Sequence, residues 1–177
     1  MIKNYFKTKH YKLTSQIKKF PILPVLLFVW LCVIWGHSMQ PAYVSSNESG
    51  TALVYINNVL HIFGIEVSEF VIRKMAHFSE FMILGILLNA NMQKLTKSAM
   101  QKLCIICTTP INRRLTHITS LLLGVICAMI DETIQLFSYG RSCEVRDVWI
   151  DFSGVILGTI IFMLIIHALD TRFRNRN

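Results

Sequence analysis

Acidic and basic side chains gather in one short stretch of this sequence, residues 131–158, between two apolar runs. The stretch holds five carboxylates, two arginines and one glutamine. Within a membrane segment an ionisable side chain costs about 2.5 to 3.5 kcal/mol by insertion scales, so it usually faces a protein interior or a water-filled cavity. Carboxylates serve as general acids and bases, and arginine binds phosphate or carboxylate in a bidentate manner. The stretch therefore predicts a polar site with internal charge pairing.

Helical spacing places these polar residues in pairs. Asp131 and Glu132 precede Gln135 by four and three residues. Asp147 and Asp151 are likewise four residues apart. Residues three or four apart share one face of a helix. We therefore expect carboxylates on two helices to flank the turn between them, residues 137–146, which contains Gly140, Arg141 and Arg146.

A second polar group begins another apolar run. Lys74, His77 and Glu80 follow one another at intervals of three, so Lys74 and Glu80 lie within about 60° of His77 on a helical wheel. A lysine or arginine near a helix end can extend to the lipid headgroups, and we expect Arg73 to do so. Histidine and glutamate are too short for this. We therefore predict that His77 and Glu80 face a shared polar site.

The composition is that of a membrane protein. The chain has 177 residues, is 53% hydrophobic and has a mean hydropathy of +0.49. Several apolar runs approach the roughly 20 residues that cross hydrocarbon. We predict an all-α integral membrane bundle in one transmembrane domain, residues 21–168, with about four spans at 22–38, 71–91, 117–137 and 148–168.

The distribution of charge predicts how the chain crosses the membrane. Six lysines lie in residues 1–20, five basic residues in 92–116 and three in 170–177, against none in 39–70. The positive-inside rule then places both basic termini, 1–20 and 169–177, in the cytoplasm of a multi-pass cell-membrane protein. The net charge of +8 is explained by topology, so we predict no nucleic-acid partner. This topology brings all the polar groups to the outer leaflet.

Two further segments carry weaker signals. In the outer segment 39–70, Leu53, Ile56, Leu60 and Phe63 recur at helical spacing, which predicts a helix at 51–63 lying in the outer interface. The five cysteines include an isolated Cys104-x-x-Cys107 and a Cys143 without an obvious partner. A single CxxC is weak evidence for a metal or redox site, and Cys143 is expected to be a free thiol.

Three blocks together resemble one family. KMAHFSEF at 74–81, DETIQLFSYGR at 131–141 and DVWIDFSGVILG at 147–158 are similar to the VanZ-like family. Its members are small helical membrane proteins of Gram-positive bacteria, named for a protein associated with teicoplanin resistance. The resemblance covers about half of the chain, 71–158, and many relatives carry asparagine at the position of Asp151. The matching residues are Lys74, His77, Phe78, Asp131, Glu132, Gln135, Arg141, Asp147, Asp151, Gly154 and Gly158.

The first functional hypothesis is an enzyme that acts at the outer leaflet on a membrane lipid or a lipid-linked cell-wall precursor and lowers susceptibility to teicoplanin. His77 would be its general base or nucleophile, and Asp131 or Glu132 would orient it or act as an acid. Lys74 and Arg141 would hold a phosphate or carboxylate. The remaining binding residues would be Glu80, Gln135, Asp147 and Asp151.

Three alternatives use the same residues. The protein could bind and shield a lipid headgroup, a peptide stem or the antibiotic without turnover. The charges could form a buried salt-bridge network that fixes helix packing. A hard divalent ion could be held by the carboxylates and His77, but with a single histidine and no HExxH motif no metal site is assigned, and any cofactor stays unknown. Gly154-x-x-x-Gly158 suits close helix packing, within one bundle or in a homo-oligomer.

Overall fold

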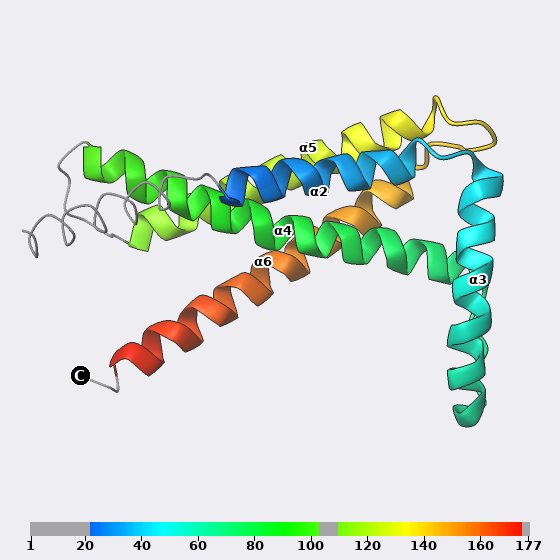
Figure 1. Cartoon of the computed structure of the whole chain (residues 1–177). Helices are drawn as coiled ribbons and strands as arrows, with labels where there is room; N and C mark the ends of the chain where they lie inside the picture. The colour runs from blue at the N-terminus through cyan, green and yellow to red at the C-terminus, as the bar shows by residue number, and fades with distance from the viewer. Residues whose placement is uncertain (1–21, 103–109, 175–177) are drawn as a thin grey trace, which may run out of the picture.

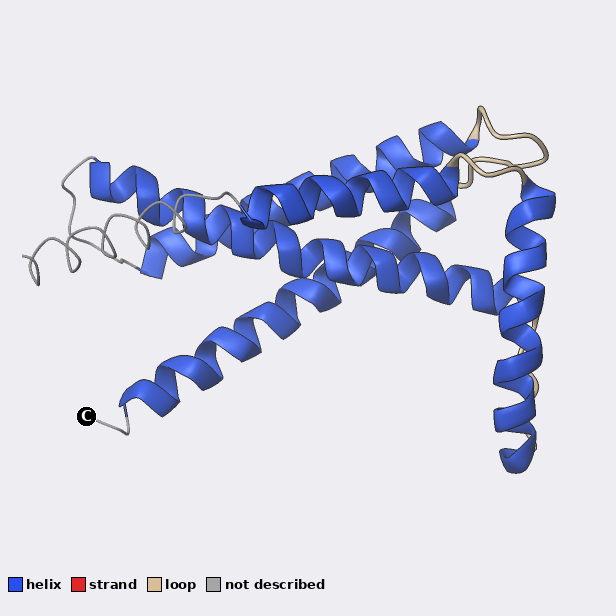
Figure 2. Cartoon of the chain, viewed as in Figure 1, coloured by secondary structure: helices blue, strands red, loops and turns tan. Residues whose placement is uncertain are grey.

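The computed structural model describes residues 22–102 and 110–174. The basic N-terminal segment 1–20 and the pair Cys104 and Cys107 lie outside these residues. The described part is all-helical and contains no strand (Figure 1, Figure 2). Its elements are α2 (Ile22–Ser38), α3 (Ala42–Leu60), the short 3-10 helix η1 (His61–Phe63), α4 (Glu69–Lys102), α5 (Pro110–Gln135) and α6 (Val145–Arg174).

Helix α4 lies at the centre of the arrangement. It contacts each of the other four α-helices, and its most extensive contact is with α6. Helices α2, α4 and α5 extend along the bundle, whereas α6 crosses α4 and diverges toward the C-terminus (Figure 1). Helix α3 stands across one end of the bundle, after a bend of 105° between α2 and the α3–η1 segment. The predicted helix at 51–63 is therefore present, and it begins nine residues earlier, at Ala42.

Within the described residues 22–102 and 110–174, two helices are long and apolar enough to cross a membrane. They are α5 over Arg113–Gln135 and α6 over Val145–Arg172, and the bent α2–α3 pair qualifies as a third if it is one span. Helix α2 alone has 17 residues, fewer than the roughly 20 that hydrocarbon requires. In α4, the polar residues Glu80, Asn89 and Asn91 interrupt the apolar run. The predicted spans at 22–38 and 71–91 are thus helices whose crossing stays a prediction.

The outer face of α5 has the character of a lipid-facing surface. Ile118, Leu122, Ile126 and Met129 recur every three or four residues, and each is more than half exposed. Such a stripe would be unfavourable in water, since contiguous exposed apolar patches on soluble proteins mark contact surfaces. The stripe agrees with α5 as a membrane-spanning helix.

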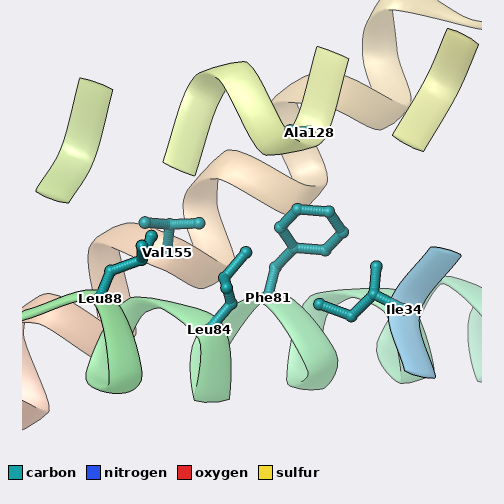
Figure 3. Packing of buried hydrophobic residues seen from close by; sticks show 6 residues of the cluster. All are labelled: Ile34, Phe81, Leu84, Leu88, Ala128 and Val155. Carbon is teal, nitrogen blue, oxygen red and sulfur yellow. The ribbon is translucent and has the colours of Figure 1, made fainter. Parts of the chain in front are cut away.

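A small apolar core joins four of the helices. Phe81 and Leu84 of α4 are fully buried and pack with residues from α2, α5 and α6 (Figure 3). The cluster lies directly beside the polar end of α4, and it therefore fixes how the polar side chains on the four helices face one another. Its members are Ile34, Phe81, Leu84, Leu88, Ala128 and Val155.

The Gly154-x-x-x-Gly158 motif packs inside the chain. A Cβ atom added to Gly154 would lie 2.4 Å from the Phe78 carbonyl oxygen, and one added to Gly158 would lie 2.0 Å from the Met82 carbonyl oxygen. These are backbone atoms, so the two helices touch main chain to main chain. The expectation that the motif permits a close helix approach is confirmed, and the helix that approaches is α4.

Candidate functional site

The polar residues that the sequence singles out lie at one end of the bundle. The C-terminal ends of α2 and α5 meet the N-terminal ends of α4 and α6 there, beneath the loop 136–144 (Figure 1). Gly140 in this loop has φ of +75°, a backbone conformation that glycine adopts without steric cost. The loop thus turns where the sequence predicts, and it covers the polar end.

Asp131 is the most enclosed acid of the site. Its side chain is 0% exposed and accepts a 2.6 Å hydrogen bond from Ser38 Oγ and a 3.1 Å bond from Gln135 Nε2. His77 Nδ1 lies 3.9 Å from Asp131 Oδ2, too far for a hydrogen bond. Of the two adjacent acids Asp131 and Glu132, Asp131 is still the one that faces His77, because among the described residues only its carboxylate comes within 4.0 Å of a His77 ring nitrogen.

Glu132 serves a different partner, although it is adjacent in sequence. One carboxylate oxygen accepts a 3.0 Å hydrogen bond from Gln135 Nε2, and the other accepts a 3.1 Å bond from the backbone N–H of Glu144. One oxygen is thus engaged within α5, and the other holds the loop 136–144 on the end of that helix. Glu132 positions the loop, and its contacts give it no direct approach to His77.

Lys74 and Asp147 form an ion pair between α4 and α6. The Lys74 ammonium group also lies 5.3 Å from the centroid of the Phe70 ring, on which Arg146 packs at 5.5 Å. A cation over an aromatic face is attracted by the ring quadrupole. Arg146 turns outward, where its 2.8 Å ion pair with Glu144 is exposed.

A pocket of about 110 Å³ opens at this end of the bundle. Arg73, Lys74 and Arg141 supply three cations to its wall. Burial, followed by the nearby charge of Arg73, lowers the pKa of Arg141, but arginine stays protonated in proteins. Other residues that line the pocket are Ala42, Phe70, His77, Gln135, Ser142, Glu144 and Asp147.

Glu80 lies apart from this pocket. Its carboxylate Oε1 is 2.6 Å from His37 Nδ1, and its backbone carbonyl accepts a 3.0 Å hydrogen bond from Trp30 Nε1. Glu80 therefore ties α4 to α2. The half-buried Glu80 has a partner, but this partner is a histidine of α2 and not His77.

His77, Asp131 and Asp151 form the group best placed to hold a metal ion. Each offers one ligand atom, and these atoms all lie within 4.8 Å of one another. Asp151 is 2% exposed, and its Oδ2 atom has no hydrogen-bond partner among the described residues. The spacing of Asp147 and Asp151 puts both on one face of α6, yet only Asp151 reaches this group.

Three contributors to the site were not expected from the sequence. Ser38 and His37 end the first apolar run, and their polar side chains there are the only signal that could have identified them. Arg73 lines the pocket, which the sequence did not indicate, and its extension to the headgroups stays a prediction. The roles of His37 and Ser38 depend on partners more than 40 positions away in the sequence. The role of Arg73 depends on the shape of the pocket.

The family model described as VanZ/LLP1 matches residues 23–166. This chain belongs to the VanZ/LLP1 family. The match includes α2 and α3, which the three sequence blocks at 71–158 leave out. The Ser38–Asp131 hydrogen bond ties α2 to the site, and Ala42 of α3 lines the pocket. No curated protein and no solved structure matches the chain.

The VanZ/LLP1 region therefore contains the complete polar end of the bundle. Each helix from α2 to α6 begins or ends within it, and every site residue named above falls between 23 and 166. The lining residues of the pocket that the structure describes all lie inside the match, between Ala42 and Asp147.

Proposed function

We propose that this VanZ/LLP1 protein binds the phosphate of a membrane lipid or lipid-linked cell-wall precursor at the outer leaflet of the cell membrane and acts on it there. The observation that carries the proposal is the pocket wall, where three cations, Arg73, Lys74 and Arg141, outnumber the two acids Glu144 and Asp147 around a volume of about 110 Å³. Such a space admits a phosphate-sized group. Arginine is suited to planar, bidentate recognition of phosphate, and lysine adds a compact positive charge.

The placement of the pocket supports a lipid-borne ligand. It lies at the end of helices α5 and α6, whose apolar lengths suit a membrane. It is also next to α3, whose Tyr55 and Val59 are exposed. A lipid with its chains beside the bundle would present its headgroup at this level. The predicted orientation, with both termini cytoplasmic, makes this the outer leaflet.

The family resemblance adds teicoplanin to the proposal. Glycopeptide susceptibility depends on the cell envelope, so a protein that alters or shields envelope precursors would lower it. The pocket serves turnover and simple binding equally well. An enzyme would leave a changed lipid or precursor in the cell, whereas a binding protein would protect only in proportion to its copy number.

Mass spectrometry of lipids and wall precursors tests the proposal. Cells without the protein are compared with cells that hold equal membrane amounts of wild type, Arg141→Gln or the control Arg114→Gln, which alters an exposed arginine of α5. A phosphate-bearing species that changes with wild type and the control but not with Arg141→Gln supports action on that species. Unchanged profiles, with a phospholipid that co-purifies only when Arg141 is present, support binding. If wild type shows neither a changed phosphate-bearing species nor a co-purifying phospholipid, the proposal is overturned.

A structural network is the second candidate. The Lys74–Asp147 ion pair joins α4 to α6, and Gln135 bridges two carboxylates of α5. Such contacts fix helix packing without any ligand. This candidate explains the pairs but leaves Arg73 and Arg141 without a role, since no ion pair of either is among those of the described residues.

A further inference from the structure

His77 lies between two different environments. It lines the cationic pocket, and it also belongs to the group with Asp131 and Asp151 behind that pocket. The three residues come from α4, α5 and α6, which pack on one another in pairs. The group is therefore built into the helix contacts and not onto a mobile surface.

The two carboxylates of this group lack cationic partners. Among the ion pairs of the described residues, Asp131 has only His77 at 3.9 Å, and Asp151 has none. The cations Lys74 and Arg146 are engaged with Asp147 and Glu144. Burial of an unpaired carboxylate is strongly unfavourable unless it is neutralised by a proton, a cation or a metal.

Two atoms of the group also lack hydrogen-bond partners. His77 Nδ1 and Asp151 Oδ2 are buried and have no hydrogen-bond partner among the described residues. The Asp151 residue as a whole is 2% exposed. Buried polar atoms in native proteins are nearly always satisfied, so each exception calls for an unseen partner. A nitrogen lone pair and a carboxylate oxygen together call for a partner that accepts electron density from both.

We propose that His77, Asp131 and Asp151 bind a divalent metal ion, with one imidazole nitrogen and two carboxylate oxygens as the protein ligands. Ligands at about 2.0 to 2.2 Å from one ion lie about 3 to 4.2 Å apart. The His77–Asp131 separation of 3.9 Å falls in this range. The candidate ligand atoms all lie within 4.8 Å of one another, so a small inward rotation of a side chain would bring any longer separation into the range. A mixed set of this kind suits Mn²⁺ or Zn²⁺.

The ion would be a fourth cation beside the pocket, after Arg73, Lys74 and Arg141. Three protein ligands leave coordination positions free for water or for a ligand oxygen. Because His77 borders both the ion and the pocket, a phosphate held by Arg141 and Lys74 would lie next to the metal. This role in recognising phosphate rests on the proposed function above, whereas binding of the ion itself does not.

Mn²⁺ binding to the full-length protein tests the site. The protein is purified in a phosphate-free detergent and titrated with Mn²⁺, while electron paramagnetic resonance reports the free ion. We expect saturable binding of about one ion per chain, weakened at least tenfold in Asp151→Asn and in His77→Gln. Asp170→Asn is the matched control, since Asp170 lies on α6 in an exposed pair with Arg113, and it should bind as wild type does.

Two outcomes would overturn the metal site. One is that wild type shows no saturable Mn²⁺ binding, as expected if Asp131 and Asp151 share a proton instead. The other is that Asp151→Asn and His77→Gln bind Mn²⁺ as strongly as wild type. If Asp151→Asn does not fold, His77→Gln together with wild type decides the question. This test is independent of the proposed function. Mn²⁺ binding without any Arg141-dependent lipid would support the metal site and contradict the lipid role. An Arg141-dependent lipid without Mn²⁺ binding would support the lipid role and contradict the metal site.

Discussion

Ser38 donates a 2.6 Å hydrogen bond from its Oγ to Asp131 Oδ1, and both side chains are 0% exposed. The bond joins the end of α2 to the end of α5 across 93 residues of sequence. Ser138 strengthens the same junction by donating a 2.8 Å hydrogen bond to the backbone carbonyl of Ser38. The first helix is thereby fixed to the acid that faces His77, and it is part of the site.

Substitution of Ser38 by alanine should weaken this junction. The variant leaves a buried Asp131 oxygen with one fewer donor, which costs about 1 to 3 kcal/mol in the free energy of unfolding. Denaturation of the purified protein in detergent measures the change. Ser79→Ala is the control, because Ser79 is exposed and bonds only to its own helix. Equal stability of the two variants would contradict a structural role for the Ser38–Asp131 bond.

The main-chain contact between α4 and α6 predicts a strong difference between two glycines. Gly158→Ala places a methyl group 2.0 Å from the Met82 carbonyl oxygen, so the helices must separate, at a cost of about 1 to 3 kcal/mol. Gly36→Ala meets nothing within 4 Å and lies inside α2, where alanine favours the helix by about 1 kcal/mol. Thermal unfolding should therefore move in opposite directions, and a shared direction would argue against the close α4–α6 contact.

Cys143 reports the charge of Glu132. Burial of the thiol and then the negative charge of Glu132 raise the pKa of Cys143, although the residue as a whole is exposed. Because the thiolate is the reactive form, its reaction with a maleimide at pH 7.5 should be slower than that of a model cysteine peptide. The rate should rise with pH over a range displaced upward from the peptide's. In Glu132→Gln the thiol pKa falls and the reaction becomes faster.

The cysteine measurement needs one background and one control. All variants lack the other four cysteines, so that only Cys143 reacts. Glu144→Gln removes an exposed carboxylate next to Cys143 whose charge is already paired with Arg146 at 2.8 Å. The rate of this variant should match that of the background. No acceleration in Glu132→Gln would mean that this carboxyl carries no charge near the thiol.

A charge exchange separates the structural candidate from the functional one. Lys74→Met leaves Asp147 unpaired, and loss of one partner of a buried pair costs about 3 to 5 kcal/mol, so the amount of protein in the membrane should fall. Lys74→Asp combined with Asp147→Lys should restore that amount. The lipid change should stay absent, because the new lysine extends from α6 and not from α4. Recovery of both would favour the network alone.

The helices and the position of the site were accessible from the sequence. The apolar run 22–38 coincides with α2, and the runs 117–137 and 148–168 lie within seven residues of the bounds of α5 and α6, because polar and charged residues bound them. Residues three and four apart met as expected, so that Gln135 bonds both Asp131 and Glu132. Local periodicity is sufficient for such predictions, since it needs no knowledge of the neighbouring helix.

The division of roles within the site was not accessible. Asp131 and Glu132 are adjacent, and successive helical residues point about 100° apart. Which one faces His77 depends on how α5 is rotated against α4, and that rotation is set by the close packing of glycines and core side chains. The pairing of Glu80 with His37 likewise depends on where α2 lies, and spacing within α4 says nothing about it.

The bend of 105° after α2 has a consequence for how deeply the protein sits in a bilayer. Helix α3 stands across the bundle end with Tyr43, Val54 and Val59 exposed, and Ala42 at its start lines the pocket. A helix resting on the boundary between headgroups and acyl chains would hold the cationic pocket at a constant height relative to that boundary. The distance from the acyl chains to the bound group would then be a criterion of selection, and ligands with longer or shorter spacers would be excluded by depth alone.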